Sequence, residues 1–125
     1  MVIMELPVAL VIDLDESLES IVPALQDAGF QAVHVLESTE EVTSALDLSP
    51  LVIIVGERTV SIEGTDLLPF LRSRTDCPIV AIGIGEEMAM VKAMLEGADV
   101  CLREPLNVRI LIAHIRALLR RFGAS

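Results

Sequence analysis

Residues 52–60 read VIIVGERTV, and they decide the fold of this 125-residue chain. Four consecutive β-branched residues predict a strand that is buried on both faces, as in a parallel sheet covered by helices. The run stops at Gly56, and the charged residues Glu57 and Arg58 follow it. The strand therefore ends on a residue without a side chain, at the edge where α/β proteins place their functional groups.

Short apolar segments and helical patterns alternate along the rest of the chain. Gly29 and Gly97 are expected to end two helices, and Ser38 and Asn107 to cap two others. The alternation predicts a single α/β domain spanning 1–125, with a doubly wound, five-stranded parallel sheet and helices on both faces. The predicted strands are 8–12, 32–36, 51–55, 79–82 and 100–102, and the predicted helices are 16–28, 38–46, 65–74, 86–95 and 107–121.

Two prolines fall inside predicted helices, where a proline removes a backbone donor and costs about 3 kcal/mol. Pro23 therefore predicts a kink in the first helix. Pro69 predicts a late or irregular start for the third helix. Neither proline changes the predicted topology.

The composition is that of a core-rich domain without a membrane segment. Hydrophobic residues make up 53% of the chain, yet no run reaches the roughly 18–20 apolar residues of a spanning helix. The start MVIMELPVAL lacks the basic and small-residue features of a signal peptide, and Cys77 and Cys101 have neither CxxC spacing nor histidine partners. We therefore expect a cytoplasmic protein that binds no membrane.

The charge balance argues against direct contact with nucleic acid. The net charge is −10, and neither Tyr nor Trp is present to stack on bases. We interpret Arg116, Arg120 and Arg121 as opposing the dipole of the last helix. The stretch GIGEE (83–87) holds only a lone GxG, so we expect no nucleotide cofactor.

Four segments resemble the receiver domain of two-component response regulators. ALVIDLDESL (9–18) is similar to the family's first strand and acidic loop, and CPIVAIG (77–83) to its fourth strand. MLEGADVCLREPL (94–106) resembles its Gly-Ala-Asp segment and Lys-Pro turn, and IRALLRRF (115–122) the last helix of its winged-helix transcription-factor subgroup. The resemblance covers the whole chain and implies the CheY-like, flavodoxin-like (βα)5 fold.

The resemblance also implies that most of the family's phosphorylation chemistry is missing. A glycine cannot accept a phosphoryl group, and a glutamate in place of the family's lysine would repel one. We therefore expect no catalytic residue, and by resemblance a cis bond between Glu104 and Pro105. The family's positions fall on Asp13 and Leu14 (the Mg²⁺-binding acidic pair), Gly56 (the acceptor Asp), Gly83 (the switch Ser/Thr), Cys101 (the switch aromatic) and Glu104 (the lysine).

These positions predict an atypical receiver domain, not an enzyme, that acts by phosphorylation-independent protein–protein contact. Resemblance to the winged-helix subgroup implies a homodimer formed through the fourth helix, fifth strand and fifth helix. It also implies transcription control through a DNA-binding domain outside this chain, with a stand-alone single-domain protein as the alternative. The candidate interface residues are Lys92, Met94, Leu95, Asp99, Ile112 and Arg116.

A second interpretation is a small-molecule sensor. Gly56 and Gly83 remove side chains from neighbouring strand ends and could leave a ligand pocket at the vacated phosphorylation site. Leu14 and Ile84 would make such a pocket apolar. The opposing expectation is that surrounding side chains fill the space.

The acidic residues of the same edge allow two further interpretations. Glu57 could accept or mimic a phosphoryl group, although a surface charge paired with Arg58 is favoured. Asp15 is a second alternative acceptor. Asp13 and Asp15 are weak candidates for a metal site, and solvated loop carboxylates near a helix start are favoured instead.

Overall fold

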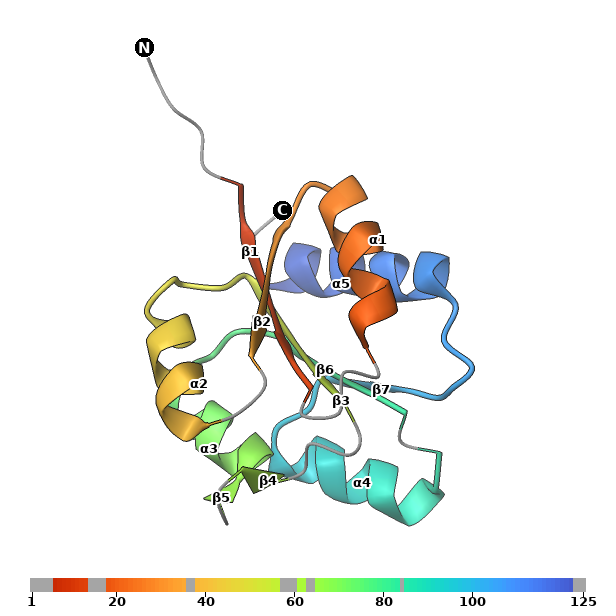
Figure 1. The fold of residues 1–125 in the computed structure, drawn as a ribbon. Helices are drawn as coiled ribbons and strands as arrows, with labels where there is room; N and C mark the ends of the chain where they lie inside the picture. Colours follow the sequence, from red (N-terminus) through yellow and green to blue (C-terminus); the bar gives the residue numbers. More distant parts are fainter. Residues whose placement is uncertain are drawn as a thin grey trace.

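The structure is a computed structural model that describes residues 6–13, 18–35, 38–56, 61–62, 65–83 and 85–122. Strands and helices alternate along it, as the apolar segments predict (Figure 1). In chain order the elements are β1 (Val8–Ile12), the 3-10 helix η1 (Glu19–Ile21), α1 (Val22–Asp27), β2 (Gln31–Val35), α2 (Thr39–Leu46), β3 (Val52–Gly56), β4 (Ser61–Ile62), β5 (Thr65–Asp66), α3 (Leu67–Arg74), β6 (Ile79–Ile82), α4 (Glu87–Glu96), β7 (Val100–Leu102) and α5 (Val108–Arg121).

Five strands form one parallel sheet in the order β2-β1-β3-β6-β7, which confirms the predicted doubly wound architecture. The strand formed by the β-branched run, β3, lies at the centre of this sheet. Ile54 of β3 is in register with Val11 of β1 on one side and Val80 of β6 on the other. All five residues of β3 are buried, as its run of β-branched residues predicts.

Alternate residues of each strand pack on opposite faces of the sheet, because successive strand side chains point to opposite sides. Figure 1 shows α1 and α5 on one face of the sheet and α2, α3 and α4 on the other. On the first face, Val11 and Ile54 pack with Leu25 of α1 and Ile115 of α5. On the second, the intervening residues of β1 and β3 pack with α2 and α3.

The ends of the helices largely follow the residues that predict them. Ser38 Oγ accepts a hydrogen bond from the Glu41 amide at 3.1 Å, and Asn107 Oδ1 accepts from the Arg109 amide at 2.9 Å. Gly29 and Gly97 follow α1 and α4 with φ of 96° and 138°, a conformation that favours glycine. Both caps and both stops are confirmed.

The first helix differs from the prediction. The segment predicted as one helix over 16–28 contains η1 followed by α1, and Pro23 lies in the first two positions of α1. Pro23 therefore marks a helix start, where its missing N–H needs no partner, and the predicted kink is wrong. The late start of the third helix is confirmed, because α3 begins at Leu67, two residues before Pro69.

A short hairpin between β3 and α3 was not predicted. Ser61 and Ile62 of β4 pair antiparallel with Asp66 and Thr65 of β5. Strands of two residues are too short to produce an alternating hydrophobic pattern, so periodicity does not reveal them. Within the described ranges, no helix has the length and hydrophobicity needed to cross a bilayer.

Candidate functional site at the carboxyl edge of the sheet

Asp13 and Gly56 meet at the carboxyl edge of the sheet. Ile12 of β1 is in register with Val55 of β3, so the next residue of each strand lies at the same level. Asp13 is fully buried, and its carboxylate accepts a hydrogen bond from the backbone N–H of Leu18. The predicted solvated loop carboxylate is therefore wrong for Asp13, which fastens the start of η1 to the end of β1.

The space beside Gly56 is occupied by these two neighbours. A Cβ atom at Gly56 would lie 3.1 Å from Asp13 Oδ1 and 3.5 Å from Leu18 Cδ1. The first of these distances is shorter than an ordinary van der Waals contact. The space that a ligand pocket would need at Gly56 is therefore filled by Asp13 and Leu18. This agrees with the expectation that surrounding side chains fill the vacated position.

Gly83 and Glu104 lie near the same edge. Gly83 has a φ of 98°, a conformation that side-chain-bearing residues rarely adopt, and its N–H donates to the carbonyl of Leu102 at 2.7 Å. A serine or threonine at this position would be strained in this backbone. Glu104 is exposed, and the Glu104–Pro105 bond is cis, as the resemblance implies.

Cys101 lies on β7 and is half-buried. Burial raises the pKa of its thiol above the ordinary value, which keeps the thiol protonated and unreactive at neutral pH. Its Sγ is 3.9 Å from the carbonyl oxygen of Met90 on α4. The position that by resemblance would hold an aromatic residue therefore carries a small side chain packed beneath α4.

Several predicted residues lie outside the described residues, namely Leu14, Asp15, Glu57, Arg58 and Ile84. The interpretations that depend on them stay predictions. Across the part of the chain that the structure describes, no group of three His, Cys, Asp or Glu side chains is placed to hold a metal ion.

The outer face of α4 carries large apolar side chains. Leu95 is 83% exposed and Met88 69% exposed, and Val91 and Met94 are exposed as well. The inner face carries small residues, because Ala93 packs with Ala81 and Ala98 over the end of the sheet. This arrangement inverts the usual pattern of a surface helix, in which the large apolar residues face the core.

Three of the predicted interface residues make contacts within the chain. Lys92 Nζ is 3.8 Å from Glu96 Oε1 one turn along α4. Asp99 Oδ2 is 3.3 Å from Arg72 Nη2, and Ile112 is half-buried against the core beneath α5. Met94, Leu95 and Arg116 are exposed.

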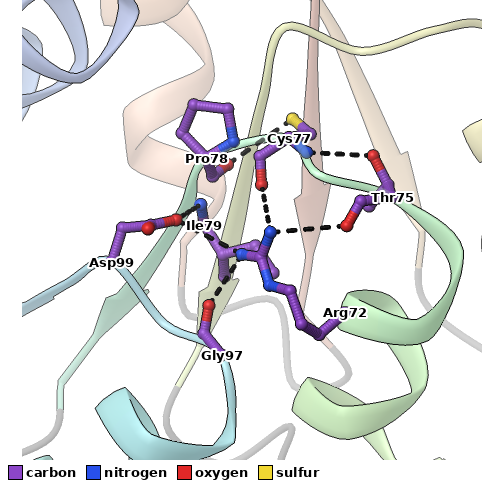
Figure 2. Close-up of polar contacts among 7 residues, drawn as sticks. All are labelled: Arg72, Thr75, Cys77, Pro78, Ile79, Gly97 and Asp99. Carbon is purple, nitrogen blue, oxygen red and sulfur yellow. Dashed lines mark hydrogen bonds and ion pairs between the residues drawn. The ribbon is translucent and has the colours of Figure 1, made fainter. Parts of the chain in front are cut away.

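A polar cluster around Arg72 joins α3, β6 and α4, and the sequence did not reveal it (Figure 2). The Arg72 guanidinium donates to the carbonyls of Cys77 at 3.1 Å and Gly97 at 2.7 Å. Asp99 Oδ2 accepts from the Ile79 amide at 2.8 Å and faces Arg72. Arg72 and Asp99 are 27 residues apart in the sequence, and local sequence motifs do not reveal contacts over such a separation.

This Arg72 cluster also surrounds a cysteine. Burial raises the pKa of the Cys77 thiol to about 12, while Arg72 lowers it and Asp99 raises it to smaller extents. The thiol is therefore protonated at neutral pH, and its Sγ lies 3.5 Å from the carbonyl oxygen of Pro78. Cys77 is consequently a packed side chain and not a nucleophile.

Known proteins similar to this chain are response regulators. The DNA-binding response regulator MtrA of Mycobacterium tuberculosis is 31% identical over 114 residues, covering 90% of this chain and 50% of MtrA. The transcriptional regulatory protein CpxR of Klebsiella pneumoniae is 33% identical over 113 residues, covering 90% of this chain and 49% of CpxR. The chain therefore spans about half the length of the curated relatives it matches.

The fold is also that of solved receiver structures. A two-component response regulator from Clostridium difficile is 26% identical, with a TM-score of 0.79 over 93% of this chain and 98% of that one. The receiver domain of NtrX from Brucella abortus superposes with a TM-score of 0.75 at 20% identity, over 90% of this chain and 98% of that one. No family model matches the sequence. The resemblance, the strand order and these relatives agree, and the chain is a response-regulator receiver domain of two-component signalling with the CheY-like fold.

Proposed function

We propose that this receiver domain acts without phosphorylation, by forming a homodimer through α4, β7 and α5. The observation that carries the proposal is Gly56. A glycine at the carboxyl end of the central strand offers no nucleophile, and its side-chain position lies against the buried carboxylate of Asp13. By resemblance this is the position of the acceptor aspartate.

The charge at Glu104 supports the same proposal. A phosphoryl group carries about −1.5 to −2 charge, and a lysine beside it would stabilise that charge. Glu104 places a negative charge where the resemblance expects the lysine. A phosphorylated state at this edge would therefore be repelled twice, by Glu104 and by Asp13.

The outer face of α4 supports the dimer. Met88, Val91 and Leu95 are spaced by three and four residues, so they form one stripe along the helix, and Met94 lies beside it. Such a stripe can pack against the same stripe of a second copy about a two-fold axis. Because Asp99 and Lys92 already contact residues of their own chain, the apolar side chains should contribute most of the association energy.

The transcriptional part of the proposal rests on the relatives. MtrA is named a DNA-binding response regulator and CpxR a transcriptional regulatory protein, and each is about twice as long as the matched region. We propose that this chain likewise controls a linked DNA-binding domain, and that the domain described here makes no direct contact with nucleic acid.

The test is sedimentation equilibrium combined with native mass spectrometry, with and without acetyl phosphate and Mg²⁺. We expect a dimer whose subunit mass is unchanged by acetyl phosphate. Leu95→Glu should convert the dimer into a monomer, because it places a charge in the apolar contact. Leu48→Glu, at an exposed leucine that follows α2, is the matched control and should leave the dimer intact.

Salt dependence separates apolar contact from ion pairing. Each subunit carries a net charge of −10, so screening should leave an apolar dimer unchanged or strengthen it as salt rises. An interface based on Lys92, Asp99 and Arg116 would weaken instead. A subunit heavier by one phosphoryl group, or a Leu95→Glu variant that still dimerises, would contradict the proposal.

A further inference from the structure

We propose that a cleft between η1 and the loop joining β7 to α5 binds a small organic ammonium ion. This inference goes beyond the dimer and does not depend on it. The cleft has a volume of about 310 Å³ and lies over the carboxyl end of β6. Its lining includes Leu18, Ile21, Ile82, Glu104 and Leu106.

The cleft is adjacent to the vacated phosphorylation position without containing it. Leu18 lines the cleft, and its Cδ1 would lie 3.5 Å from a Cβ atom at Gly56. One side chain therefore separates the two. The cleft lies between elements that come from distant parts of the chain.

The lining combines apolar side chains with an equal share of polar surface, a mixture that suits an amphiphilic ligand. Four leucine and isoleucine side chains and Pro105 form the wall, and Ser20 and Glu104 supply the polar side chains. A volume of about 310 Å³ is at the lower end of the range for ligand sites, about 300–1,000 Å³, so the ligand is small. Its body should be a short hydrocarbon.

The charge of the site selects a cation. Glu104 is the charged side chain of the lining, and the buried carboxylate of Asp13 accepts a hydrogen bond from the backbone N–H of Leu18, another lining residue. Arg103 precedes Glu104 in the chain and is exposed, but it does not line the cleft. An anionic ligand would be repelled here, whereas an ammonium group can donate to Glu104 while its hydrocarbon contacts the wall.

The test is a titration followed by amide NMR chemical shifts, with three probes of nearly equal shape: isopentylammonium, isopentanol and isovalerate. We expect isopentylammonium to shift the amides of Leu18, Ser20, Ile82 and Leu106 saturably in the millimolar range. Isopentanol should bind at least several-fold more weakly, and isovalerate should produce no saturable shift at these amides.

Two variants test whether the Glu104 carboxylate binds the ammonium group. Glu104→Gln keeps the shape of the side chain and should weaken isopentylammonium binding about tenfold, the usual order of effect for one charge-assisted hydrogen bond. Glu40→Gln changes an exposed glutamate on α2 and should leave the affinity unchanged. The proposal is overturned if no saturable shift occurs, if isovalerate or isopentanol binds as well as the ammonium ion, or if Glu104→Gln binds as well as the parent. The proposed dimer is unaffected by any of these results, because it is measured separately.

Discussion

Replacing Gly56 with aspartate should destabilise the fold and should not restore phosphorylation. The new Cβ would lie 3.1 Å from Asp13 Oδ1, so Asp13 must shift by a few tenths of an ångström. Asp13 is fully buried and bonded to the Leu18 amide, which resists such a shift. Overpacking of this kind typically costs about 1–3 kcal/mol.

The second carboxylate adds an electrostatic penalty. Two unit charges about 4–5 Å apart repel by roughly 3–4 kcal/mol at an effective dielectric constant of about 20. Partial exposure at the sheet edge and proton uptake reduce this value, so we expect about 2 kcal/mol at pH 7. Gly56→Asn has the same shape without the charge, and the difference between the two variants isolates the electrostatic part.

The sign of the pH dependence follows from the paired carboxylates. Each disfavours the ionised form of the other, so the pair has a folded-state pKa raised above the unfolded value. The penalty is therefore fully present above the folded pKa and is lost as the pH falls toward the unfolded value of about 4. We expect the stability gap between Gly56→Asp and Gly56→Asn to be largest at pH 7 and to shrink as the pH falls toward about 5.

Urea unfolding followed by far-UV circular dichroism is the assay, because the chain has no Trp or Tyr to report by fluorescence. Gly56→Ala adds only the Cβ, so its free energy of unfolding gives the cost of the contact with Asp13 without the rest of the Asp or Asn side chain. A Gly56→Asp variant as stable as Gly56→Asn at pH 7 would contradict this prediction, since the carboxylate would then have room. So would a phosphoryl adduct on Gly56→Asp, because Glu104 should prevent one.

Four further outcomes test other parts of the structure. Arg72→Ala should lower the free energy of unfolding by about 2–3 kcal/mol, because it leaves the carbonyls of the Arg72 cluster without their charged donor. Arg116→Ala, at an exposed arginine, should change it by less than about 0.5 kcal/mol in the same urea assay. Asn107→Ala should cost about 1 kcal/mol through the lost cap of α5, visible as a lower urea midpoint with an unchanged m-value. The Cys77 thiol, with its pKa raised from 9.0 to about 12, should be alkylated at pH 8 at least about tenfold more slowly than an unperturbed thiol, because the loss of thiolate exceeds the gain in its nucleophilicity. Mapping the adducts by mass spectrometry should show Cys101 modified before Cys77, and equal rates would contradict the buried environment.

Local patterns account for most of the fold. The β-branched run of β3 predicts a strand buried on both faces, and the structure has one. The predicted strand at 79–82 matches β6 to the residue, and Gly97 stops α4 where expected. These features depend on neighbours along the chain, which a single sequence reports directly.

Features that depend on distant residues were not predictable in this way. Asp13 lies against Gly56 of the neighbouring strand, and the Arg72 cluster depends on Gly97 and Asp99, far along the chain. The α4 sequence is apolar on most sides, so periodicity cannot show which face is buried. The structure shows that Ala93 faces inward, where it packs with Ala81 and Ala98.

The position of α4 connects the proposed dimer with the proposed loss of the phosphoacceptor. A surface that is presented only after phosphorylation needs a helix with two arrangements and a phosphoryl group that favours one of them. Here the Arg72 guanidinium holds the carbonyl of Gly97 at the end of α4 and the carbonyl of Cys77 at the start of β6. A Cβ at Gly97 would lie only 3.1 Å from Arg72 Cβ, so this contact is packed as well as bonded. We therefore expect these contacts to favour a single arrangement of α4 with its apolar face outward, as the proposed phosphorylation-independent interaction requires.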